Sequence, residues 1–267
     1  MTRRQFLTAA AALTAGLVAG RGVAQTYTFD TLHATRRIAT LRAPLRVAFL
    51  ADLHYGIYIR RDSVARWVDA TNEQAPDLIL LGGDLVDRTS GGSSTDDLLS
   101  ELARLRAPLG VYATWGNHDH ARFSGTRAFE EALGSAGIVM LRNRGVSARD
   151  DLFVAGLDDF RSGRPDVPAT LRGRPADAAC LLVSHNPDAL PRVPVDVDLT
   201  LCGHTHGGQI RLPGVGAIVT SSRYGRRFVA GWVDGPALGY VSRGLGFSLI
   251  PLRVDCPAEL TILDLTP

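Results

Sequence analysis

The sequence predicts an α/β fold with two sheets, and three observations lead to this. Before residue 210, short apolar runs alternate with segments of helical spacing, the pattern of strands joined by helices. Polar residues, above all Asp and His, directly follow several of these runs. Beyond residue 210 the chain turns often and holds further strand-like segments, so we expect this tail to add a second sheet.

The expected strands before residue 210 are the apolar runs at 45–51, 78–81, 110–114, 139–141, 152–157, 180–183 and 198–202. Helical spacing covers 62–74, 96–105 and 126–135. In the tail we expect antiparallel strands at 228–233, 238–241 and 260–265. Residues 158–177 are rich in Gly and Pro, which predicts a surface loop on the substrate side.

With 267 residues, 45% of them hydrophobic, the chain is long enough to bury a full core. We expect an export signal at 1–24, a polar lead-in at 25–44 and one domain at 45–267. The three cysteines form no C-x-x-C pair, and Cys180 and Cys202 lie in apolar runs, which is typical of buried thiols.

The first 24 residues are typical of a targeting segment. Arg3 and Arg4 precede a modestly apolar stretch at 8–20, and small residues lead up to Ala24. The segment resembles a twin-arginine export signal cut after Ala24, which implies the twin-arginine export machinery as a partner and a periplasmic or cell-envelope location. An anchor, if the signal is not cut, and an ordinary amphipathic helix are the alternatives.

The charge of the chain does not predict a nucleic-acid partner. Three arginines and no acids lie in residues 1–24, so the remainder carries 26 arginines against 27 acidic residues. A near-neutral chain without an aromatic and basic stripe offers no electrostatic surface for nucleic acid. We therefore do not expect a nuclease.

Five of the seven histidines follow expected strands, together with carboxylates and an amide. Because the carboxyl ends of neighbouring strands meet at one sheet edge, we expect these side chains to converge there on a pair of metal ions. The candidate residues are Asp52, His54, Asp84, Asn117, His118, His185, His204 and His206.

Five motifs in this order resemble the calcineurin-like metallophosphoesterase superfamily: Asp52-x-His54, Gly83-Asp84-x-x-Asp87-Arg88, Gly116-Asn117-His118-Asp119, the single His185 and Gly203-His204-x-His206. The resemblance covers about residues 45–210. It implies a four-layer α/β/β/α sandwich with two mixed sheets. The export signal, Gly207-Gly208-Gln209-Ile210 and the segment 241–246 resemble a branch of small exported bacterial phosphodiesterases.

The resemblance also implies roles for the ligands. Asp52, His54 and His206 would hold one ion, Asn117, His185 and His204 the other, and Asp84 would bridge both. The ligands are nitrogen and oxygen atoms only, so manganese is expected, with iron or zinc as alternatives. Such a pair of divalent ions activates a bridging hydroxide for in-line attack on phosphorus.

Three further residues receive catalytic roles from the resemblance. His118 would act on the leaving oxygen as hydrogen-bond donor or general acid, and Asp87 would orient its ring. Arg88 would contact a phosphoryl oxygen, although Thr89 stands where the family's signature has glycine. A solvated or ion-paired Arg88 is the alternative. Weaker candidates for the substrate pocket are Tyr55, His120, Arg122, Tyr224, Arg226, Arg227 and Arg243.

The expected activity is therefore that of a binuclear metal-dependent phosphoesterase, a phosphodiesterase acting on a phosphate ester. One alternative is a pyrophosphohydrolase or phosphodiesterase of a lipid-linked or nucleotide-sugar substrate, with peripheral membrane or cell-wall association. It would require an apolar groove beside the metals, formed by the 158–177 loop or by Phe228, Phe247 and Leu249. The other alternative is a metal-stabilised scaffold without catalysis.

Overall fold

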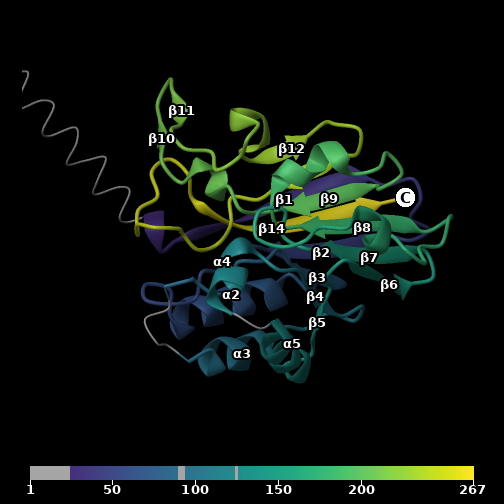
Figure 1. Ribbon diagram of the computed structural model, residues 1–267, viewed down its shortest axis with the longest axis horizontal. Coiled ribbons are helices and arrows are strands. Elements are labelled where there is room, and N and C mark those ends of the chain that lie inside the picture. Colours follow the sequence, from purple (N-terminus) through teal and green to yellow (C-terminus); the bar gives the residue numbers. More distant parts are fainter. Residues whose placement is uncertain (1–24, 90–93, 124–125) are drawn as a thin grey trace, which may run out of the picture.

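The computed structural model describes residues 25–89, 94–123 and 126–267 (Figure 1). The predicted export signal at 1–24 lies outside these residues. Over the described ranges the chain forms two six-stranded sheets and a two-stranded hairpin. Among the described helices, none has both the length and the apolar character required to cross a membrane.

The first sheet combines parallel and antiparallel strands. Its order is β1 (Phe29–Arg37), β14 (Ala258–Thr266), β2 (Leu45–Leu50), β3 (Leu78–Leu81), β4 (Val111–Ala113) and β5 (Ile138–Met140). Strands β2 to β5 run parallel to one another, whereas β14 pairs antiparallel with β2 and parallel with β1.

The second sheet is also mixed. Its order is β12 (Gly231–Val233), β13 (Gly239–Val241), β9 (Leu199–Cys202), β8 (Ala179–Ser184), β7 (Leu152–Leu157) and β6 (Arg144–Arg149). The four central strands are parallel, and the edge strands β6 and β12 are antiparallel to their neighbours. The separate hairpin consists of β10 (Arg211–Leu212) and β11 (Gly216–Ala217).

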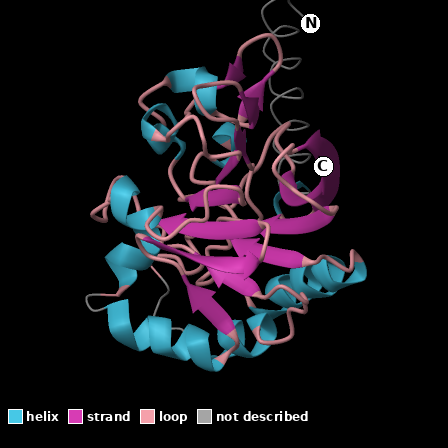
Figure 2. Cartoon of the chain, turned by 90° about the vertical axis from the view of Figure 1, so that its right-hand side faces the viewer, coloured by secondary structure: helices cyan, strands magenta, loops and turns pink. Residues whose placement is uncertain are grey.

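Helices cover both outer faces. They are α2 (Arg61–Glu73), α3 (Asp96–Leu102), α4 (Asn117–Arg122), α5 (Thr126–Ser135), α6 (Val167–Thr170) and the 3-10 turns η1 (Pro187–Arg192), η2 (His206–Gly208) and η3 (Gly225–Phe228). In Figures 1 and 2 the longer helices α2, α3 and α5 line the outer side of the first sheet.

Alternation along the strands produces the layers. On β2, Ala48 and Leu50 pack with the helices of the first sheet, and Val47 and Phe49 pack against the second sheet. The outer face of the second sheet, including Phe153 of β7, packs with residues of α6 and η1. The predicted four-layer α/β/β/α sandwich with two mixed sheets is confirmed.

Two expectations about the ends of the chain need correction. The sheet begins before residue 45, because β1 lies within the expected lead-in and Leu32 and Ala34 pack against the core between the sheets. The tail does not build the second sheet alone, since β14 enters the first sheet between β1 and β2. The polar pattern of β1 did not predict a strand, and the apolar pattern at 260–265 predicted a strand but not its partners, which depend on contacts between distant residues.

The topology brings the polar residues to one edge. Strands β2, β3 and β4 of the first sheet and β8 and β9 of the second all deliver candidate ligands just after their carboxyl ends. The backbone joins these ends: Asp52 N–H donates to Gly83 O (3.0 Å), and Gly203 N–H donates to His185 O (3.0 Å). This shared edge is where α/β proteins place their sites.

Candidate metal centre

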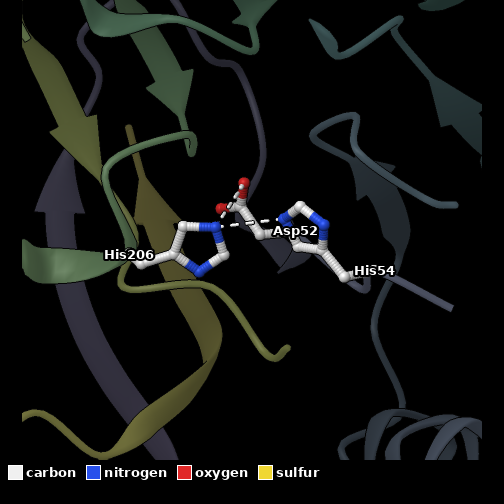
Figure 3. Close-up of side chains that lie close together, drawn as sticks. All are labelled: Asp52, His54 and His206. Atoms are coloured by element: carbon white, nitrogen blue, oxygen red, sulfur yellow. Dashed lines mark hydrogen bonds and ion pairs between the residues drawn. The ribbon is translucent and has the colours of Figure 1, made fainter. Parts of the chain in front are cut away.

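One group of ligand atoms joins the first sheet to the second. Figure 3 shows Asp52 and the rings of His54 and His206 directed toward one another. The Nε2 atoms of His54 and His206 are 3.1 Å apart, and Asp52 Oδ1 is 3.8 Å from His206 Nε2. Two ligand atoms that each lie about 2.1 Å from one ion at a right angle are roughly 3 Å apart, so this group fits a cation.

A second group surrounds the His185 ring. His185 Nε2 is 3.2 Å from His204 Nδ1, 3.3 Å from Asn117 Oδ1 and 3.3 Å from Asp84 Oδ2. On the other side of the same ring, Nδ1 donates to Gly82 O at 2.8 Å. This bond fixes the direction of the ring, so that Nε2 faces the other three ligand atoms.

Asp84 lies between the two groups. Its Oδ2 is 3.6 Å from His54 Nε2 and 3.3 Å from His185 Nε2. Its Oδ1 accepts a hydrogen bond from the His118 backbone N–H at 2.7 Å, which fixes the direction of the carboxylate. The structure thus brings the seven proposed metal ligands close together, with Asp84 between the two groups, and His118 also lies within reach of His54 and Asp84.

The backbone at this edge is unusual in a way that strand periodicity does not reveal. Asp52, His54, Asp84, His204 and His206 all have positive φ, between 49° and 73°. Non-glycine residues rarely adopt this region, and such strain concentrates at functional sites. Positive φ, rather than alternation along an extended strand, turns these side chains toward the centre.

Two glycines leave the space that the carboxylates fill. A Cβ on Gly116 would lie 2.1 Å from Asp84 Oδ1, and a Cβ on Gly203 would lie 2.6 Å from Asp52 Oδ2. Asp52 then accepts the His204 backbone N–H on both oxygens, at 2.9 and 3.0 Å. Any side chain at Gly116 or Gly203 would therefore collide with the carboxylate of Asp84 or Asp52.

Burial and mutual charge determine the protonation of the ligands. Burial opposes ionisation of Asp84, yet the charge and hydrogen bond of His185 hold the pKa of that carboxyl well below its usual range. Burial and the charge of His185 lower the pKa of His204 to about 3. Burial and the charge of His54 likewise lower the pKa of His206.

The residues present fit two divalent cations. Asp52 and Asp84 are 0% and 2% exposed, and buried carboxylates require compensating positive charge. His204 and His206 are held neutral, the form in which imidazole binds a metal. His206 Nδ1 has no hydrogen-bond partner within the described part of the chain. A proton on Nδ1 would leave the lone pair of Nε2, which faces His54 and Asp52, available to a metal.

His118 lies at the mouth of the centre, with its ring edge-on to His54 at a centroid distance of 4.6 Å. Asp87 lies between the two rings: its Oδ2 is 3.5 Å from His54 Nδ1 and its Oδ1 is 3.9 Å from His118 Nδ1. Asp87 Oδ1 also accepts the Thr89 N–H and hydroxyl, each at 2.7 Å. Asp87 is therefore near His118 as expected, but it is closer to His54.

Arg88 is exposed and lines a hollow of about 400 Å³ above the centre, together with Asp84, Asn117 and His204. Arg161 also lines this hollow and was not predicted. The signal for it was present, because Arg161 belongs to the 158–177 segment expected on the substrate side. Two arginines therefore flank the space in which a phosphoryl group would meet both ligand groups.

Asp119 was named from the sequence only as part of a motif, without a role, and in the structure it caps helix α4. Its carboxylate accepts the backbone N–H of Gly116 and of Val86, each at 3.0 Å. These bonds tie the segment that carries Asn117 and His118 to the loop after β3. The spacing of Asp119 three residues after Gly116 was the available signal for a capping interaction.

The weaker pocket candidates lie elsewhere in the described structure. His120 Nε2 is 2.8 Å from the buried carboxylate of Asp158, and Arg243 Nε donates to Glu259 Oε2 at 2.7 Å. None of the weaker candidates lines the 400 Å³ hollow formed by described residues. Phe228 does not form the apolar groove that was considered beside the metals, because its ring is buried in a separate cluster with Leu190 and Val241.

Comparisons with known proteins agree with this geometry. A family model described as calcineurin-like phosphoesterase matches residues 45–208. The uncharacterized metallophosphoesterase YkuE of Bacillus subtilis (strain 168) is 33% identical over 285 residues, covering 99% of this chain and 98% of that protein. The phosphodiesterase YaeI of Escherichia coli (strain K12) is 38% identical, covering 84% and 83%.

Among solved structures, a dimetal phosphatase from Danio rerio aligns with a TM-score of 0.43 and 14% identity, over 78% of this chain and 89% of that one. The family assignment rests on the family model and the two bacterial relatives, which span most of the chain. The chain belongs to the calcineurin-like phosphoesterase family, which is part of the metallophosphoesterase superfamily of hydrolases.

Proposed function

We propose that this protein is a binuclear metal-dependent phosphodiesterase. The observation that carries the proposal is the pair of ligand groups that share Asp84 Oδ2 below a hollow flanked by arginines. The name of the Escherichia coli relative, a phosphodiesterase, supports diesters as the substrate class. Manganese is the proposed metal, with iron or zinc as alternatives, because all the ligand atoms are nitrogen or oxygen.

The chain's own residues hold the ions and bind the substrate. Asp52, His54 and His206 would hold one ion, Asn117, His185 and His204 the other, and Asp84 both. When bound, two divalent ions supply a strong nucleophile from water and neutralise phosphoryl charge. Arg88 and Arg161 would bind the non-bridging oxygens and orient phosphorus above the centre.

His118 is proposed as the general acid. On one side of its ring, His118 Nδ1 lies 3.5 Å from the Arg88 backbone N and 3.9 Å from Asp87 Oδ1. His118 lines the substrate hollow beside Asp84 and Arg88, where its ring can donate a proton to the leaving oxygen. His118 also forms a third possible ligand group with His54 and Asp84, so metal analysis of a His118 variant separates a catalytic role from a ligand role.

The test is hydrolysis of bis(p-nitrophenyl) phosphate with manganese, by wild type and by His118→Ala. The variant keeps the backbone N–H that binds Asp84, so the metals should stay bound while kcat falls by roughly 10² to 10⁴. Metal analysis of both proteins checks the first point. If both proteins carry metal and are equally inactive on this and other phosphate esters, the proposal fails.

A panel of phosphomonoester, phosphodiester and pyrophosphate substrates separates the proposal from the pyrophosphohydrolase alternative. The proposal expects the highest kcat/KM on a diester. A pyrophosphate preferred over every diester would select the alternative.

We further propose export by the twin-arginine machinery to the periplasm or cell envelope. Arg3, Arg4 and the small residues before Ala24 support this. Replacing both arginines with lysine should retain the protein in the cytoplasm, which fractionation measures. Unchanged export of that variant would contradict the proposal.

A further inference from the structure

Exposed apolar side chains border the metal centre. A groove of about 280 Å³ opens beside the 400 Å³ hollow, and His206, Ser221, Ser248 and Leu249 line both. The walls that belong to the groove alone are mostly aliphatic and include Ile210, Ile218, Val219 and Ile250. The groove is therefore continuous with the space that a phosphoryl group would occupy.

The side chains of this groove are exposed rather than part of a core. Val219 is 65% exposed, Ile218 58% and Ile250 48%. Leu249 is 78% exposed and has a φ of 67°, a backbone conformation that a leucine rarely adopts. Exposed apolar surface of this extent is typical of an interaction site. The positive φ of Leu249 is a backbone strain of the kind that clusters at ligand-binding sites.

The groove is held in shape by Gln209, which joins its two sides. Gln209 Nε2 donates to Ile250 O at 3.1 Å, and Gln209 Oε1 accepts from Ser248 N–H at 2.9 Å. These bonds tie the segment 248–250 to the turn that presents His206. The aliphatic walls are therefore fixed relative to the ligands.

The positive charge at this site lies in the hollow beside the groove. Arg88 and Arg161 line the 400 Å³ hollow, whereas no Arg, Asp or Glu is among the described residues that line the groove. A further hollow adds Ile57, Tyr58 and Phe247, and it shares Leu249 with the groove. Apolar side chains therefore adjoin a positively charged space, a combination that fits an anionic amphiphile.

We infer that this groove binds the hydrocarbon tail of an amphiphilic phosphoester whose phosphoryl group lies at the metal centre. The inference rests on the proposed function and names its substrate class. A tail anchored beside His206 orients the ester over both ligand groups, so tail length should act on KM. Each methylene that the groove covers should lower KM by roughly threefold to fourfold.

The test compares methyl p-nitrophenyl phosphate with decyl p-nitrophenyl phosphate, both below the concentration at which the decyl ester forms micelles. For the full manganese-loaded chain we expect kcat/KM to be at least about tenfold higher for the decyl ester. Val219→Ser should reduce this ratio by about threefold or more. The matched control is Val195→Ser, because Val195 is 77% exposed and precedes β9 at the opposite edge of the sheet.

A binding measurement provides a readout independent of turnover. Calorimetry of the same loaded proteins with decylphosphonate and methylphosphonate should show tighter binding of the decyl compound to wild type and Val195→Ser. The preference should be weaker in Val219→Ser.

The outcomes separate this inference from the proposed function. If kcat/KM is equal for the two esters, the groove does not bind the hydrocarbon tail, but the proposed phosphodiesterase activity is still supported. Absence of hydrolysis defeats the proposed function, and equal binding of the two phosphonates then overturns the tail site as well. If Val219→Ser changes the sedimentation coefficient but not the ester ratio, the groove is an interface between copies of the chain, which also overturns the inference.

Discussion

The two ligand groups of the centre differ in charge and in support. The first group, Asp52, His54 and His206, contains a carboxylate of its own and spans both sheets. The second group, Asn117, His185 and His204, has no carboxylate of its own and depends on the shared Asp84 for negative charge. Its amide comes from α4, a helix of six residues. We expect the first ion to bind more tightly and the second to remain more electrophilic.

The supports of the two groups also differ. Asp52 is held by the His204 backbone N–H and by close packing of Gly203. Asn117 depends on the position of α4, which is fixed by the Asp119 cap and by His120 bonded to Asp158. A substitution that removes the bond between His120 and Asp158, just after β7, should therefore weaken binding of the second ion more than binding of the first.

Asp84→Asn should cause the largest loss, because it removes the only carboxylate oxygen common to both groups. An amide has one oxygen, and it would leave adjacent cations without the negative charge that offsets their repulsion. Both ions should bind more weakly, and activity should fall by more than the roughly 100-fold typical of losing a group that only orients a ligand. Metal titration followed by assay measures both. Retention of two tightly bound ions would refute the shared role of Asp84.

His204→Ala and His206→Ala test whether the groups are separate. Both residues have positive φ, 73° and 52°, so alanine introduces a similar backbone strain in each. His204→Ala should release the second ion and His206→Ala the first, each with a loss of activity of about 100-fold. Metal counting at increasing metal concentration distinguishes them. Equal loss of both ions in each variant, even at saturating metal, would contradict the division.

The ligand set could be predicted from the sequence because it follows strand ends. Asp52, Asp84 and His204 each come just after an apolar run, so their convergence follows from parallel strands within each sheet and from the packing of the two sheets with these strand ends together. The partners of the residues that support the ligands could not be predicted in this way. Asp158 directly follows β7, but its bond to His120 of α4 depends on a contact between distant segments, which no local period encodes.

The same limit explains the errors in the fold. Residues 260–265 were predicted as a strand from their apolar pattern, but the place of β14 between β1 and β2 depends on contacts between residues more than 200 positions apart in sequence. β1 is polar on one side because it lies at the edge of the sheet, so its pattern was typical of a lead-in. Periodicity identifies a buried face but not the strand beside it.

Asp158→Asn should have a smaller effect, confined to the second group. The Asp158 side chain is fully buried and accepts bonds from His120, from Arg142 Nε (3.1 Å) and from the Arg164 backbone N–H (2.9 Å). Losing its charge should destabilise the fold by about 3 kcal/mol and weaken the second ion more than the first. Thermal unfolding and metal titration measure the two effects. Equal weakening of both ions would show that α4 is not a separate support.

The same carboxylate predicts a pH dependence. Burial opposes ionisation of Asp158, but the hydrogen bond from His120 holds its pKa well below its usual range. The stabilisation is therefore complete above the unfolded-state pKa of about 4 and is lost as pH falls below it. Unfolding free energy measured between pH 5 and 2 should fall less steeply in Asp158→Asn than in wild type. If the unfolding free energy fell equally steeply with pH in both proteins, the Asp158 carboxylate would not be the source of this pH dependence.

Asn117→Asp should produce the smallest change and the most informative one. A carboxylate at this position would place a second negative charge in the second group, 3.3 Å from His185 Nε2. The second ion should bind about tenfold more tightly, an effect of roughly 1.4 kcal/mol. Added negative charge makes that ion a weaker electrophile, so kcat should fall while the first ion is unaffected. If the variant bound both ions more tightly, or raised kcat, the neutral amide would not be what distinguishes the two groups.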